Sequence, residues 1–198
     1  MAKQTRAKSE ITRQNLLDAA LVVIGKQGYA GATVEKIAEE AGVSKGVIYY
    51  YFDTKADIAT SVLLNTFERI VDRFNEITAK NEAPGVAMQE LIREFARQVF
   101  ANREASRFLL TEIWRSDRIW SDEMRTLEER LAAMFAKLLQ GGIDSGRVRS
   151  KVDMQFASVS IIGIVLSSAQ YYLMTDDDNH EESFANNCID FISHALEA

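Results

Sequence analysis

The chain has 198 residues and a formal net charge of −6, with 47% hydrophobic and 26% charged residues. This composition is that of an ordinary soluble globular protein and excludes a disordered or fibrous chain. The acidic net charge also argues against a protein that coats nucleic acid without selectivity.

The charge is unevenly distributed along the chain. Residues 1–60 contain eight Lys or Arg and seven Asp or Glu, a net charge of +1, which leaves −7 for the remaining residues. An acidic body limits indiscriminate phosphate binding and leaves the N-terminal part free to dock on DNA. The single cysteine, Cys188, has no intrachain disulfide partner, and the first residues lack the apolar stretch of a secretory signal. We therefore expect a cytoplasmic protein.

Apolar residues recur at helical spacing almost throughout, which predicts an all-α fold. The first helix is expected over residues 10–26, with Gly28 ending it. Thr33 is placed to cap a short second helix that ends at Gly42. Ser44 is placed to cap a third helix that ends near Phe52.

A capping box of Thr54 and Asp57 predicts a long fourth helix that ends near Lys80. Breaks farther along the chain predict five more helices, over residues 86–101, 103–115, 120–145, 153–174 and 181–196. About nine helices are thus expected in two domains. Residues 1–53 form a helix-turn-helix domain, and residues 54–198, beginning with the linking helix 54–80, form a domain for effector binding and dimerisation.

One of these helices requires a second interpretation. Residues 154–175 contain no charged side chain and are long enough to cross a bilayer as a helix. However, the segment carries several Ser and Gln residues, stands alone, and is followed by acids rather than Lys or Arg. These features favour a helix buried in a soluble protein over a membrane span.

The stretch from Thr33 to Phe52 carries the clearest functional signal. Two short helices around a glycine turn are too small to enclose a core, so they are typical of a helix-turn-helix that packs on the first helix. With Ile48 facing inward, Phe52, Ser44 and Tyr51 fall near it on the helical wheel. Gly46 and Tyr50 fall on the opposite face, and the flanks are formed by Lys45, Val47 and Tyr49.

This outward face is unusual for a surface exposed only to water. Tyrosine hydroxyls can bind phosphate while the rings contact sugars and thymine methyl groups. Gly46 lowers the stability of a helix by roughly 1 kcal/mol relative to alanine. A glycine at this position would be explained if the DNA backbone approached too closely for a side chain. The third helix also begins without an acid, and Lys55 lies in the first turn of the fourth, an arrangement suited to phosphate.

Residues 11–63 resemble the DNA-binding domain of the tetracycline-repressor (TetR) family. The resemblance rests on matching residue types at matching spacing, in the runs Leu17-Asp18-Ala19-Ala20, Gly28-Tyr29, Thr33, Ile37-Ala38, Ala41-Gly42-Val43-Ser44, Gly46, Tyr49, Tyr51-Phe52 and Lys55. One departure is Ile24, where the family usually has phenylalanine.

This resemblance implies a homodimer that binds a palindromic operator, represses transcription and is released by a small molecule. At matching positions it implies phosphate contacts for Thr33, Ser44, Tyr49 and Lys55. It directs Lys45, Gly46, Val47 and Tyr50 toward base edges, and it allows either role for Tyr51.

Beyond about residue 65 only the architecture resembles the family, so the effector and dimer sites are predicted from residue types. Large apolar and aromatic side chains predict a pocket for a lipophilic or aromatic effector, lined by Phe108, Trp114, Trp120, Met124, Phe156, Tyr171 and Tyr172. Small residues permit close helix approach, so the last two helices are expected to pair across a two-fold axis through Ser160, Gly163, Ser167, Phe184, Cys188, Phe191 and Ile192.

No spacing of Ser, Cys or His supports nucleophilic catalysis, and neither a cofactor nor a metal site is predicted. Two alternatives remain beside the repressor. One is a DNA-binding activator or an effector-free architectural factor, and the more remote one is an all-α enzyme.

Overall fold

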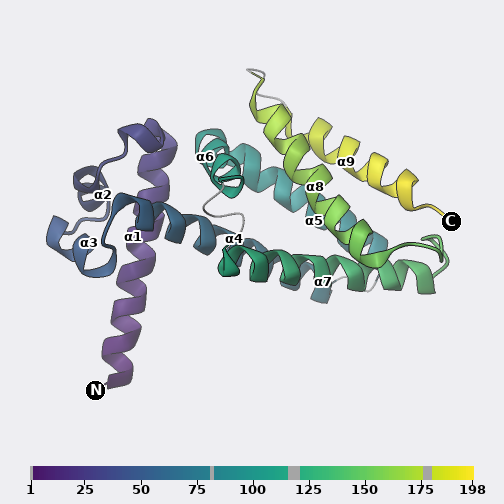
Figure 1. Ribbon diagram of the computed structural model, residues 1–198, viewed down its shortest axis with the longest axis horizontal. Helices are drawn as coiled ribbons and strands as arrows, with labels where there is room; N and C mark the ends of the chain where they lie inside the picture. The colour runs from purple at the N-terminus through teal and green to yellow at the C-terminus, as the bar shows by residue number, and fades with distance from the viewer. Residues whose placement is uncertain (1, 81–82, 116–120, 176–179) are drawn as a thin grey trace. The chain divides into compact units, whose positions relative to one another are not determined.

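The computed structural model describes residues 2–80, 83–115, 121–175 and 180–198, with side chains from residue 9 onward. These residues form nine helices, as the sequence predicts (Figure 1). The helices are α1 (Ala2–Gly31), α2 (Val34–Glu40), α3 (Lys45–Tyr51), α4 (Lys55–Lys80), α5 (Pro84–Ala101), α6 (Arg103–Ile113), α7 (Asp122–Asp144), α8 (Met154–Leu173) and α9 (Glu181–Leu196).

The chain divides into two compact units. The first unit comprises residues 1–66 and 102–115, and the second comprises residues 67–101 and 116–198. The first unit extends past residue 53 because Ile58, Ala59 and Val62 of α4 pack in its core, and it includes α6, which packs against α1.

Most helix ends follow the local signals. The Thr33 hydroxyl accepts a hydrogen bond from the backbone N–H of Lys36 at 3.3 Å. Thr54 and Asp57 form the expected reciprocal capping box, with N–H to oxygen distances of 2.9 and 3.1 Å. In contrast, Ser44 lies at the N-cap of α3 without a side-chain capping bond.

α1 is longer at both ends than the sequence pattern predicts. Toward the N-terminus it begins at Ala2 rather than near Glu10, because residues 2–9 contain no helix breaker. Gly28, which was expected to end the helix, has a positive φ of 69° but only kinks it, and the last turn continues to Gly31.

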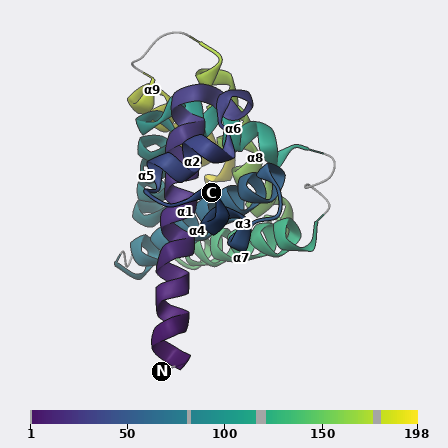
Figure 2. The same cartoon turned by 90° about the vertical axis from the view of Figure 1, so that its left-hand side faces the viewer.

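Each helix of the first unit buries one of its sides in a common core. Leu16, Ala20 and Ile24 of α1 pack with Ile37 of α2 and Ile48 of α3 in one buried cluster. α2 lies against α1, and α3 lies against α2 (Figures 1 and 2). α4 and α6 complete the cluster with Ile58, Ala59, Val62 and Phe108.

The second unit contains α5, α7, α8, α9 and the part of α4 that begins at Phe67. α5 packs on α9, and α7 packs on α8. Phe184 of α9 is completely buried, and its ring centroid lies 5.6–6.3 Å from those of Phe95, Phe100 and Tyr172. This aromatic cluster joins α5, α8 and α9.

Candidate nucleic-acid interface

α3 is held by its inward face. Ile48 and the C-cap residue Phe52 are buried in the core of the first unit. The turn before α3 requires Gly42, whose φ of 66° is in the left-handed region that side chains disfavour. The orientation of α3 is therefore fixed by packing on one side and by a turn glycine at its start.

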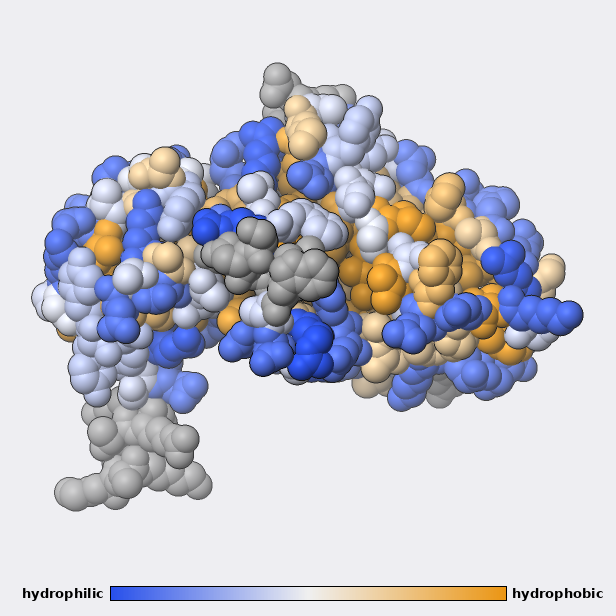
Figure 3. All heavy atoms as spheres, viewed as in Figure 1, coloured by the Kyte–Doolittle hydropathy of each residue, from blue (hydrophilic) through white to orange (hydrophobic). Residues whose placement is uncertain are grey.

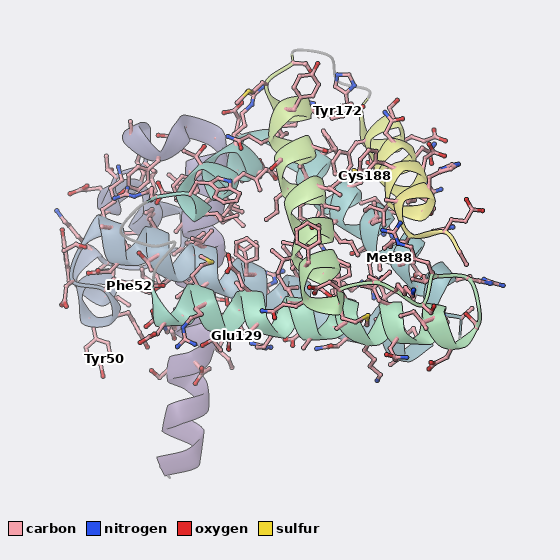
Figure 4. The ribbon with its side chains drawn as sticks, turned by 45° about the vertical axis from the view of Figure 1, so that its right-hand side comes forward. Tyr50, Phe52, Met88, Glu129, Tyr172 and Cys188 are labelled. Atoms are coloured by element: carbon pink, nitrogen blue, oxygen red, sulfur yellow. The ribbon has the colours of Figure 1, made fainter. Side chains whose placement is uncertain are left out.

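The opposite face of α3 is exposed, as the helical wheel predicts. Tyr50 is 80% exposed and Tyr49 48% exposed. Figure 4 shows Tyr50 projecting outward from α3. Gly46 is also at the surface, and Val47 is half-buried on the flank. Rings with hydroxyl groups and a surface glycine thus lie together on one short helix, which suits close contact with DNA.

Lys45 is held in place by two neighbours. Its ammonium group forms an ion pair with the Glu35 carboxylate of α2 and lies 5.6 Å from the centroid of the Tyr49 ring. The hydrogen bond from Lys45 lowers the pKa of Glu35 to about 2, and the same bond raises the pKa of Lys45. The lysine is therefore a positioned cation on the outward face.

Lys55 and Tyr51 make contacts within the first unit. Lys55 Nζ donates to the carbonyl oxygen of Ala30 at 3.4 Å and lies 4.3 Å from the centroid of the Tyr29 ring. The hydroxyl of Tyr51 is 3.1 Å from Ser9 Oγ on α1. A phosphate contact by Lys55, as the family resemblance implies, would compete with its bond to Ala30.

The sequence carries no signal for the contact between Glu35 and Lys45. Glu35 stands in the first turn of α2, where an acid suits the helix dipole with or without a partner. The contact with Lys45 joins two helices across the Gly42 turn. No periodicity within either helix could have indicated it.

The structure does not gather the predicted effector residues around one cavity. Phe108 is buried in the first unit, stacked on Tyr29 with a centroid distance of 5.3 Å. Met124 is buried in the second unit, whereas Phe156 and Tyr171 are exposed on α8.

The remaining effector candidates are equally scattered. Trp114 is exposed at the end of α6, and Tyr172 accepts a hydrogen bond from Asn187 at 2.7 Å. Trp120 lies outside the described residues. Residue type does not determine which side of a helix faces the interior, so an effector site formed by these residues stays a prediction.

An apolar pocket of about 40 Å³ lies elsewhere in the second unit. Its lining comes from α4, α5, α7 and α8 and consists of Phe67, Ile70, Phe74, Leu91, Ile92, Phe95, Leu131, Phe135, Ile162, Val165 and Leu166. A wider groove of about 540 Å³ lies where α5 begins and α7 and α9 end. Met88, labelled in Figure 4, is among the groove's lining residues.

Two ion pairs fasten α4 within the second unit. Arg130 of α7 binds Glu68 at 2.6 Å, and Arg73 binds Glu94 of α5 at 3.3 Å. Burial raises the pKa of Glu94, but the hydrogen bond from Gln98 and the charges of Arg97 and Arg73 outweigh it and lower the pKa. These pairs connect α4 to both α5 and α7, the helices that share the apolar pocket with it.

The predicted dimer residues divide into two groups. Phe184, Cys188 and Ile192 are buried within the protomer, so a second chain could contact them only after repacking, and their place in a dimer interface stays a prediction. Phe191, Ser167, Ser160 and Gly163 retain full or partial exposure.

α8 carries an exposed apolar face beside these small residues. Phe156 is 73% exposed, and Val159, Tyr171 and Met174 are exposed as well. Figure 3 shows hydrophobic side chains gathered at the surface over this helix. α8 is also long and apolar enough to cross a membrane by length and composition, which for a single helix is weak evidence of a span.

A helix-turn-helix with a fixed inner face and an exposed aromatic and basic outer face defines a DNA-binding transcriptional regulator. Two family models match the chain. The model described as "Bacterial regulatory proteins, tetR family" matches residues 16–62, and "Tetracyclin repressor-like, C-terminal domain" matches residues 84–175. The chain belongs to the TetR family of transcriptional regulators.

Similar proteins extend over nearly the whole chain. The fatty acid metabolism regulator protein of Bacillus subtilis (strain 168) is 23% identical over 190 residues, which cover 96% of each chain. The regulator SrpR of Pseudomonas putida is 25% identical over 185 residues, covering 92% of this chain and 84% of that protein.

A solved structure supports the fold. FadR from Bacillus subtilis, in complex with stearoyl-CoA, superposes with a TM-score of 0.80 at 22% identity, covering 93% of this chain and 99% of that one.

Proposed function

We propose that this TetR-family regulator is a cytoplasmic, ligand-responsive repressor that binds a palindromic operator as a homodimer. The observation that carries the DNA-binding role is the exposed surface of α3, where Gly46 and Tyr50 lie opposite the buried Ile48 and Lys45 and Tyr49 lie on the flanks. This geometry fits a recognition helix in the major groove.

The test is to select an operator from a random DNA library and to map the protected bases. We expect protection of two half-sites about one helical turn apart, or a multiple of one turn, because each protomer supplies one recognition helix. Transcription in vitro from a promoter that carries this site should decrease when the protein is added. An increase would favour the activator, and failure to bind any duplex at low salt would contradict DNA binding.

The dimer is proposed to form through the exposed face of α8 together with Phe191 of α9. Phe156, Val159, Tyr171 and Met174 follow one another at helical spacing, so a second copy can cover them all at once. Gly163 has open space beside its Cα, which permits close helix approach. Sedimentation equilibrium at micromolar concentration should give twice the protomer mass of 22.3 kDa.

The effector is proposed to be a lipophilic molecule with a long hydrocarbon part, and its site to be the apolar pocket of the second unit. The pocket is lined entirely by apolar side chains, and α4 contributes three of them. The pocket is small in this state, so binding must enlarge it. α4 continues from the DNA-binding unit into the pocket. A ligand that displaces α4 therefore favours one spacing of the two recognition helices in the dimer.

Stearoyl-CoA is a suitable first probe, because it occupies the structurally similar Bacillus subtilis protein. We expect it to release the operator, and Val165→Trp to weaken its binding at least about 10-fold by filling the pocket. Ser193→Trp, which places the same ring in the wider groove, is the matched control. If only Ser193→Trp weakens binding while both variants retain operator affinity, the groove is the effector site.

A further inference from the structure

The contact between Lys45 and Glu35 lies within the proposed DNA-binding surface. Lys45 is the first residue of α3, and Glu35 lies in the first turn of α2. Their side chains are 49% and 60% exposed, so the ion pair lies at the surface and is accessible to DNA. The centroid of the Tyr49 ring lies 5.6 Å from the ammonium group and further limits its movement.

A lysine held in this way differs from a free one. A free ammonium group turns toward any phosphate and releases condensed counterions when it binds. Lys45 already has an anionic partner, so a phosphate must displace Glu35 to gain the same contact. One N–H of Lys45 is directed at Glu35, which leaves its other two N–H groups in restricted directions.

We propose that Glu35 is a specificity-determining residue that reserves Lys45 for a base edge. Guanine presents two acceptors, O6 and N7, that a positioned lysine can bind in the major groove. The Glu35 carboxylate repels phosphates at the same place, so it weakens contacts that carry no sequence information. This inference rests on the proposed role of α3 in DNA binding.

The other acids of α2 have different surroundings. Glu40 forms an ion pair with Lys26 of α1 at 3.3 Å. Glu39 lines a polar hollow between α1 and α2, together with Gln27 and Lys36. Glu39 therefore provides a control with the same charge change on the same helix but a different location.

The experiment compares wild type, Glu35→Gln and Glu39→Gln by fluorescence anisotropy on the selected operator and on a scrambled duplex, from 50 to 200 mM salt. We expect Glu35→Gln to tighten binding to the scrambled duplex about five-fold more than Glu39→Gln does, since it frees a surface cation. For Glu35→Gln on the scrambled duplex, the slope of log affinity against log salt concentration should steepen by about 0.9 per protomer. This change corresponds to one added phosphate contact. Operator affinity should change less, so discrimination between the two duplexes decreases.

A second pair of variants tests whether the effect passes through Lys45. When Lys45→Gln is already present, Glu35→Gln should change scrambled-duplex affinity only as much as Glu39→Gln does. Thermal unfolding of each variant shows whether α2 remains folded, because Glu35 also suits the helix dipole.

The outcomes separate this inference from the proposed function. If wild type binds neither duplex, DNA binding itself fails. If wild type discriminates between the duplexes and Glu35→Gln matches Glu39→Gln in affinity and salt slope, the role of Glu35 is overturned while DNA binding stands. An equal loss of affinity for both duplexes by Glu35→Gln would also overturn it, since that result indicates only a structural role.

Discussion

Gly46→Leu should reduce operator affinity by at least about 100-fold while the fold of the first unit remains intact. A leucine at this position would hold α3 away from the groove floor and remove base contacts, each of which is worth about 1–3 kcal/mol. In the free protein Gly46 is exposed, so the new side chain can extend into solvent. A Cβ at Gly46 would meet only Ser44 Oγ, at 3.8 Å.

The backbone at Gly46 does not require glycine either. Positive φ values occur among the described glycines at Gly28, Gly42 and Gly146, and Gly46 is not one of them. Because glycine costs a helix up to about 1 kcal/mol relative to alanine, the leucine variant should unfold at the same temperature as wild type or slightly higher. A binding loss without a stability loss would assign this glycine to the DNA contact.

Gly42→Leu is the matched control for Gly46→Leu. Gly42 has a φ of 66°, so a side chain there strains the turn and lowers the stability of the unit. Anisotropy on the selected operator and thermal unfolding of the three proteins together provide the comparison. Wild-type operator affinity in Gly46→Leu would mean that this face of α3 does not enter the groove.

Phe184→Ala should lower the free energy of unfolding of the second unit by about 3–5 kcal/mol. The side chain is completely buried and contacts aromatic rings from α5 and α8, so its truncation leaves a cavity that the surrounding helices fill only partly. Urea denaturation at one fixed protein concentration measures the change, because the stability of a dimer depends on concentration.

Phe191→Ala, on the same helix, is the control for Phe184→Ala. Phe191 is 61% exposed, so its loss should change protomer stability by no more than about 0.5 kcal/mol and should act on dimer dissociation instead. If Phe184→Ala dissociated the dimer and left protomer stability unchanged, Phe184 would belong to the interface, as the sequence pattern predicted.

The sequence alone was sufficient for the helices and for the two faces of α3. Thr33 and the pair Thr54 and Asp57 begin helices through bonds to residues three positions away, so nearby residue types specify them. The inward position of Ile48 and the outward position of Tyr50 follow from helical periodicity once a single apolar side must be covered.

Tertiary structure decided which apolar side chains of α6, α8 and α9 are buried. α8 is apolar around most of its circumference, so its periodicity could not show that Ile161 faces the core and Phe156 faces outward. Phe108 was assigned to the effector domain, but α6 packs on α1 and places this ring in the first unit. Such contacts depend on how helices distant in sequence cross.

The Lys45–Glu35 pair depends on tertiary structure for the same reason. The two residues are ten positions apart and lie on different helices, and they meet because α3 packs on α2 after the Gly42 turn. The sequence therefore determined that α3 presents an exposed aromatic and basic face, since local periodicity and capping specify a helix and its sides. Only the packing of α2 against α3 decided that the lysine on this face is held by an acid.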